Sequence, residues 1–180
     1  MIATYLVLIL GLVALQLTWA FTDHATPLQR LCTIDLLRTS LIYGIVLLQW
    51  ISHGYFPMPP TLIVVALMPI GLMLFVAGIV LCIWAKLTMK TSWGIPAQHD
   101  IKRQHTLIKS GPYRFTRNPI YVGLFMVEFG LALALGSWLF FLVYPLYLYF
   151  GIAIKKEEAL LTKYFGKAYI EYTKRVPRYL

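Results

Sequence analysis

Long apolar stretches alternate with short charged ones along this chain. Each apolar run has about 17–25 residues, which is enough for a helix to cross a hydrocarbon core of about 30 Å. The last two runs meet at Gly136-Ser137, where a tight turn would make them an antiparallel hairpin. The pattern therefore predicts five membrane-spanning helices, at residues 2–21, 36–52, 61–85, 119–136 and 137–154.

The lysines and arginines predict how these helices are oriented. Of the sixteen, Arg30 and Arg38 lie in or near the first loop, seven lie in 86–117 and seven in 155–178. The loop at 53–60 and the turn at Gly136 contain none. All sixteen thus fall on one side of the membrane, which the positive-inside rule identifies as the cytoplasm. We expect the N-terminus outside and the C-terminus inside.

Composition agrees with an all-α polytopic membrane protein. Hydrophobic residues make up 59% of the chain and charged residues 13%, about half the share usual in soluble domains. The net charge of +9 is explained by the cytoplasmic loops, so it does not indicate nucleic-acid binding. The N-terminus lacks the basic segment of a cleaved signal peptide, so the first run is expected to be retained.

We interpret the chain as a single domain at 1–180, with three spans in 1–85 and the chemistry in 86–180. The histidines at 24, 53 and 99 have no metal-ligand spacing, so no metal site is expected.

The first charged segment leads into the fourth apolar run. Gly111-Pro112 marks a turn, and Asn118-Pro119 reads as an N-cap followed by the first helical residue. The positive end of that helix suits an anionic group such as a carboxylate. The alternative is a capped loop whose Arg114 and Arg117 reach lipid headgroups.

The second charged segment, 155–172, is expected to form a C-terminal amphipathic helix at the membrane surface. On a helical wheel Glu157 falls inside the apolar stripe and Glu158 at its edge. A carboxylate directed into packing needs a partner, such as a sulfonium, an amine, a ribose diol or Arg117. The alternative is that both acids only complement the helix dipole. The stripe consists of Leu160, Leu161, Tyr164, Phe165, Ala168, Tyr169 and Tyr172.

Glu128 lies in the middle of the fourth run, where a charge is costly and indicates a functional residue. We expect it to contact substrate. The alternative is a protonated side chain bonded to a neighbouring helix.

Two motifs resemble those of the isoprenylcysteine carboxyl methyltransferases and the related phospholipid methyltransferases. The first is His105-x-Leu107-x-x-x-Gly111-x-Tyr113-x-x-x-Arg117-Asn118-Pro119-x-Tyr121-x-Gly123. The second is Glu157-Glu158, followed by Phe165-Gly166-x-x-Tyr169-x-x-Tyr172 and Val176-Pro177. The resemblance covers roughly 98–178.

The resemblance implies a site for S-adenosylmethionine between the last two spans and the C-terminal helix. Arg117 would orient the polar head of a lipid-like substrate, with Glu158 as a second catalytic residue and Glu128 as a further substrate contact. The cofactor contacts would be Gln98, His105, Thr106, Leu107, Ile108, Tyr113, Asn118, Pro119, Ile120, Tyr121 and Glu157.

Two positions depart from the family pattern. Asn118 stands where relatives usually have histidine, so a base role there is not expected. Ala153 stands where some isoprenylcysteine enzymes have an arginine proposed to hold the substrate carboxylate.

The resemblance implies carboxyl O-methylation of an isoprenylcysteine-like compound as the expected reaction. A carboxylate nucleophile in such a reaction needs no general base. The alternatives are N-methylation of a phospholipid or another amphiphile, an NADPH-dependent sterol-reductase-like enzyme, and a non-enzymatic membrane adaptor. Membrane lipids are the expected surroundings, in a prokaryotic cell membrane.

Overall fold

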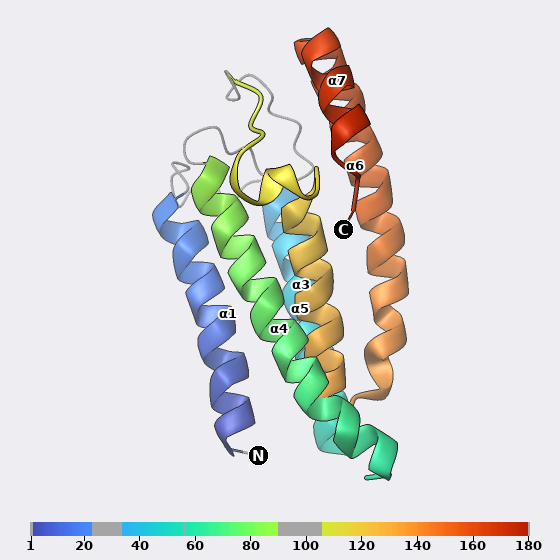
Figure 1. Cartoon of the computed structure of the whole chain (residues 1–180). Helices are drawn as coiled ribbons and strands as arrows, with labels where there is room; N and C mark the ends of the chain where they lie inside the picture. The colour runs from blue at the N-terminus through green and yellow to red at the C-terminus, as the bar shows by residue number, and fades with distance from the viewer. Residues whose placement is uncertain (1, 23–33, 56, 90–105, 180) are drawn as a thin grey trace.

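A computed structural model describes residues 2–22, 34–55, 57–89 and 106–179, with the side chains of 34–42 excluded. The described residues form helices and no strand. In Figure 1 the long helices run roughly parallel to one another, and a short helix after the last of them runs back beside its end. The elements are α1 (Ile2–Thr22), α3 (Ile34–Tyr55), α4 (Leu62–Met89), η3 (Gly111–Arg114), α5 (Pro119–Ala134), η4 (Trp138–Leu142), α6 (Val143–Phe165) and α7 (Lys167–Arg175).

Each of the five predicted spans corresponds to one of these helices. Among the described residues, α1, α4 and the stretch Trp138–Phe165 are each long and apolar enough to cross a membrane, while α5 is shorter. Most large apolar side chains of α1 and α4 face outward, as expected of helices surrounded by lipid. The chain is an all-α polytopic membrane protein, as the apolar pattern predicted.

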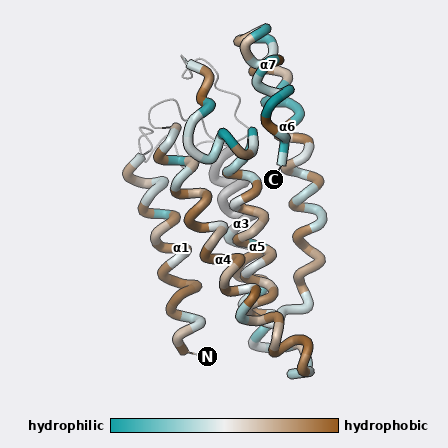
Figure 2. The backbone as a smooth tube through the Cα atoms, in the orientation of Figure 1, coloured by the Kyte–Doolittle hydropathy of each residue, from teal (hydrophilic) through white to brown (hydrophobic). Residues whose placement is uncertain are grey.

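The two uncharged connections lie at the same end of the bundle. The backbone of Pro57 pairs with that of Ser137, and the amide of Met58 donates to the carbonyl of Gly136 over 3.0 Å. Gly136 has φ +57°, so it forms the tight turn expected there. The described hydrophilic segments, α7 among them, gather at the opposite end (Figure 2). The segregation of charge to one end is therefore present in the fold.

Helices α4 and α5 form the central pair, and glycines allow their backbones to touch. A Cβ atom on Gly71 would lie 2.4 Å from the amide nitrogen of Ala134, and one on Gly130 would lie 2.4 Å from that of Phe75. Two turns along, a Cβ on Gly78 would lie 2.7 Å from the carbonyl oxygen of Gly123. Small residues commonly mediate such close packing between helices in membranes. This contact fixes the position of α5, whose first turn enters the candidate site.

The C-terminal helix differs from the expected one. Residues 155–165 continue α6, and Gly166 then interrupts the helix with φ +53°, a left-handed conformation that favours glycine. The chain reverses there, and α7 folds back beside the end of α6 (Figure 1). The expected stripe is divided as a result, because Tyr164 is exposed while Tyr169 and Tyr172 are buried. The prediction of a single continuous amphipathic helix at 155–172 was therefore wrong.

Candidate functional site

The site lies at the hydrophilic end, where the first turn of α5 meets α6 and the chain after α7. Pro119 is the first residue of α5 and Asn118 precedes it, as predicted. The Asn118 side chain makes no cap hydrogen bond to the helix, however. Its Nδ2 donates instead to the carbonyl of Arg178 over 3.1 Å. Asn118 therefore fastens the C-terminal tail, and its side chain leaves the positive end of α5 available to another anionic group.

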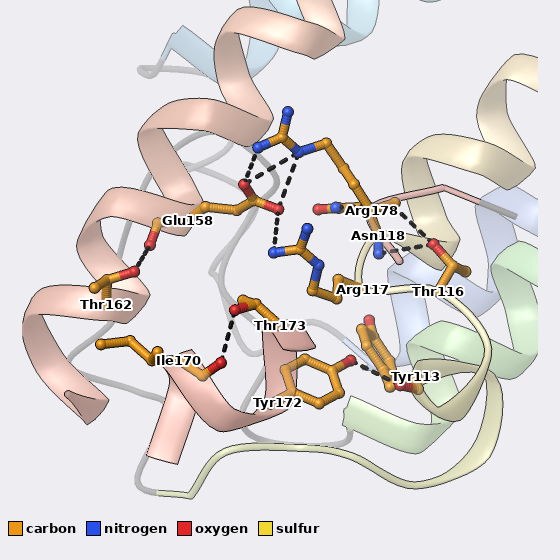
Figure 3. Close-up of polar contacts among 10 residues, drawn as sticks. All are labelled: Tyr113, Thr116, Arg117, Asn118, Glu158, Thr162, Ile170, Tyr172, Thr173 and Arg178. Carbon is orange, nitrogen blue, oxygen red and sulfur yellow. Dashed lines mark hydrogen bonds and ion pairs between the residues drawn. The ribbon is translucent and has the colours of Figure 1, made fainter. Parts of the chain in front are cut away.

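The tail of residues 176–179 runs across the entry to α5 (Figure 3). The amide of Arg117 donates to the carbonyl of Pro177 over 3.0 Å, and Thr116 Oγ1 donates to the carbonyl of Arg178 over 2.9 Å. Thr116 is fully buried. Three consecutive residues, 116–118, thus hold two consecutive carbonyls of the tail.

A buried group of aromatic and apolar residues supports this arrangement. The hydroxyl of Tyr172 donates to the carbonyl of Tyr113 over 2.7 Å, which ties α7 to η3. Leu107 packs against the buried side chains of Tyr172 and its neighbours in α7, and Ile108 packs against those of Tyr113 and Ile120. Burial raises the pKa of Tyr113 well above its usual value, and the nearby Tyr172 and Glu157 raise it further. Tyr113 is therefore a neutral phenol in this site.

Arg117 and Glu158 form an ion pair at the entry to α5. Arg117 Nη1 lies 3.0 Å from Glu158 Oε1, with 13% and 12% of the two side chains exposed. Arg178 binds the same carboxylate from the other side, with Nη2 2.5 Å from Glu158 Oε2 and Nε 3.1 Å from it (Figure 3). One carboxylate therefore holds two guanidinium groups, and we refer to Arg117, Glu158 and Arg178 as the Glu158 cluster.

The Glu158 cluster influences the aromatic residues beside it. Burial raises the pKa of Tyr169 to about 12; Glu158 raises it further, whereas Arg117 lowers it through its charge and a hydrogen bond. The hydrogen bond to Glu158 also raises the pKa of Arg178, whose guanidinium is charged at any physiological pH. The cluster therefore carries two positive charges and one acid.

Glu157 faces a different partner from its neighbour. Its Oε1 accepts a hydrogen bond from the hydroxyl of Tyr121 over 2.8 Å. Tyr121 is buried against Phe150 of α6, with ring centroids 5.2 Å apart. This pair adjoins an apolar cluster between the two helices, to which α5 contributes Leu124 and α6 contributes Leu146, Ala153 and Ile154. The helical wheel placed Glu157 toward packing, and in the structure its half-buried carboxylate does reach the adjacent helix.

Several predicted residues come together here. Tyr113, Asn118, Pro119, Ile120, Tyr121, Glu157 and the Arg117–Glu158 pair converge on the start of α5. Thr106 lies in the segment just before η3, together with Leu107 and Ile108, but its side chain is exposed. Gln98 and His105 lie outside the described residues. Arg178 was not predicted, because a contact made by a chain end with residues far away in sequence leaves no local pattern.

Glu128 is not part of this group. It lies about 13 Å along α5 from Pro119 and is 1% exposed. Its backbone carbonyl accepts a 3.4 Å hydrogen bond from Gln49 Nε2 of α3, and neither carboxyl oxygen has a hydrogen-bond partner among the described residues. The structure therefore places Glu128 deep in the bundle, apart from Arg117.

The arrangement combines three features that suit a polar head attached to an apolar tail. An arginine pair offers hydrogen-bond donors to an anion. A carboxylate on Glu157 offers acceptors to a cation or a diol. Next to the arginine pair and Glu157, an apolar cluster between α5 and α6 extends toward the middle of the bundle.

Comparison with known proteins agrees with this chemistry. Residues 66–168, which include most of α4 and all of η3, α5 and α6, match the Phospholipid methyltransferase family. The matched segment contains the α4–α5 contact, Arg117 and both glutamates.

Curated relatives carry the name protein-S-isoprenylcysteine O-methyltransferase. The protein from Xenopus laevis is 36% identical over 110 residues, which is 60% of this chain and 38% of that protein. The protein from Schizosaccharomyces pombe is 38% identical over 77 residues, 42% of this chain and 33% of the relative. The human protein is 34% identical over 109 residues, 59% of this chain and 38% of the relative.

The alignments span less than two fifths of the length of these relatives. The family match itself covers more than half of this chain. By that match, the chain belongs to the Phospholipid methyltransferase family.

Proposed function

We propose that this protein is an S-adenosylmethionine-dependent methyltransferase that methylates the carboxylate of an isoprenylcysteine-like lipid. The observation that carries the proposal is the Glu158 cluster beside the Glu157–Tyr121 pair, at the positive end of α5. All of these residues except Arg178 lie within the family match. The names of the relatives support the same reaction.

The residues present fit the donor molecule. S-adenosylmethionine has a carboxylate, an amine and a ribose diol, and when bound it supplies an electrophilic methyl group on a sulfonium. The start of α5, whose N-cap side chain is engaged elsewhere, suits its carboxylate. Glu157 suits the amine or the diol, because a half-buried carboxylate accepts hydrogen bonds from both. Tyr113, Ile120 and Ile108 would enclose its apolar parts.

In this proposal the protein contributes positioning and the exclusion of water. A carboxylate nucleophile is already ionised, so no side chain has to remove a proton. Arg117 would orient it, since its Nε has no hydrogen-bond partner among the described residues. Glu158 holds Arg117 in place. The apolar lining of α5 and α6 would keep the reacting groups dry and aligned, which strengthens the electrostatic contacts there.

Glu128 would act at the other end of the substrate. Its depth in α5 excludes contact with a group held by Arg117, so we assign it to the part of the lipid inside the bundle. With the hydrophilic end in the cytoplasm, in a prokaryotic cell membrane, the donor would enter from water and the lipid from the bilayer.

N-methylation of a phospholipid is the second candidate, and the name of the matching family favours it. An amine acceptor must be neutral to react, which would require a base near the methyl group. The arginine pair favours an anionic acceptor instead.

Calorimetric titration of the purified protein in detergent tests the cofactor. We expect saturable binding of S-adenosylmethionine, whose amine or ribose diol Glu157 would accept, and no binding of NADPH. Binding of NADPH alone would instead support a reductase, and binding of neither would support a non-enzymatic adaptor.

A further inference from the structure

The second guanidinium of the Glu158 cluster comes from the tail, and its role differs from that of the tail backbone. The carbonyl of Arg178 accepts hydrogen bonds from Thr116 and Asn118, so the main chain alone fastens the tail to α5. Tyr179 packs against Tyr147 of α6, with ring centroids 6.2 Å apart. The path of the tail is therefore set without the Arg178 side chain.

The Arg178 guanidinium is turned toward Glu158 and is more accessible than its counterpart. Its side chain is 37% exposed, against 13% for Arg117. The carboxylate of Glu158 accepts hydrogen bonds from Nε and Nη2 of Arg178 and forms an ion pair with Nη1 of Arg117. Each guanidinium carries five N–H groups, so both retain donors for a further anion.

The charges of the Glu158 cluster do not cancel. Within the cluster, two guanidiniums and one carboxylate leave one positive charge. An anionic ligand group would complete the balance. Guanidinium pairs are well suited to carboxylates, because their planar N–H groups match the two carboxylate oxygens.

We propose that Arg178 and Arg117 together form a two-guanidinium site that selects an acceptor lipid with a carboxylate head. Glu158 holds the two side chains close enough to share that head. The inference rests on the proposed methyltransferase function and adds the residue that decides between an anionic and an uncharged acceptor. Arg178 would therefore be a specificity residue supplied by the segment that follows α7.

Binding of two matched probes tests the proposal: a farnesyl thioether carboxylic acid and its methyl ester. In the intact protein the acid should bind more tightly than the ester. In Arg178→Gln we expect the affinity for the acid to fall roughly 10- to 100-fold, the effect of losing a charged hydrogen bond, while that for the ester is unchanged. Arg178→Lys should restore part of the difference. Arg175→Gln, which changes an exposed arginine of α7, is the control and should leave both affinities unchanged.

The ratio of the two affinities distinguishes recognition of the carboxylate from loss of structure, because a damaged fold would weaken the binding of both probes. An unchanged ratio in Arg178→Gln, whether both affinities are retained or both fall, would overturn the inference. The affinity for S-adenosylmethionine is measured in the same samples. If the unaltered protein binds no S-adenosylmethionine, the proposed function itself fails; if it binds and the ratio does not change, only the role of Arg178 fails.

Discussion

Replacing Glu157 by alanine is expected to lower the affinity for S-adenosylmethionine by at least about 100-fold, beyond the range of calorimetry. The half-buried carboxylate of Glu157 already accepts one hydrogen bond from Tyr121, and we expect it to accept two more from the cofactor. Hydrogen bonds to a charged group contribute about 1.5–3 kcal/mol each, so losing two gives this effect. The variant also leaves the buried hydroxyl of Tyr121 without this acceptor.

Glu171→Ala is the matched control for that experiment, because it removes an exposed acid from α7. It should bind the cofactor as the unaltered protein does. Glu157→Gln should be intermediate, since the amide oxygen still accepts from Tyr121 but has lost its charge. Unchanged affinity in Glu157→Ala would show that the cofactor is not held at this end of α6.

The second large effect is expected at Gly130, where α5 touches α4. A leucine there would place its Cβ 2.4 Å from the backbone nitrogen of Phe75, and backbone cannot move aside as a side chain can. The helices would have to separate, which we expect to destabilise the fold by about 3 kcal/mol, the upper end for overpacked cores. The melting temperature should fall by roughly 6–12 °C.

Thermal unfolding in detergent, followed by the helical circular dichroism signal, measures this change. Gly151→Leu is the control, because a Cβ at Gly151 meets nothing within 4 Å. We expect its melting temperature to stay the same or to rise slightly, since glycine is a poor helix former. Equal behaviour of Gly130→Leu and Gly151→Leu would contradict the close α4–α5 contact.

The sequence predicted the elements of this fold well because membranes constrain them strongly. Apolar runs long enough to span the bilayer must be helical, and each of the five coincides with a helix. The turn at Gly136 followed from the same pattern. Arg117 and Glu158 were placed in one site from their motifs, and their ion pair is present.

The features that were missed depend on contacts rather than on periodicity. Gly166 was read as part of a continuous helix, although a glycine near the end of a helical pattern is a recognised stop signal. The glycines at 71 and 78 and at 123 and 130 repeat every seven residues, a small-residue pattern that could have indicated the α4–α5 contact.

The roles of Asn118 and Arg178 had no such signal. Asn118 has the right residue type for a helix cap, yet the tail carbonyl provides a competing acceptor. Arg178 reaches Glu158 only because Gly166 reverses the chain and the tail then pairs with residues 116–118. Tertiary contacts of this kind decide which of several suitable partners a polar side chain takes.

Transfer of a labelled methyl group tests the central claim most directly. The purified protein is incubated with S-adenosylmethionine labelled in its methyl group and with the farnesyl thioether carboxylic acid, and the lipid products are identified by mass spectrometry. We predict a labelled methyl ester of the lipid, from which alkali releases labelled methanol. The variant Glu157→Ala should form no labelled ester. Absence of label from the thioether acid would contradict carboxyl methylation by this protein.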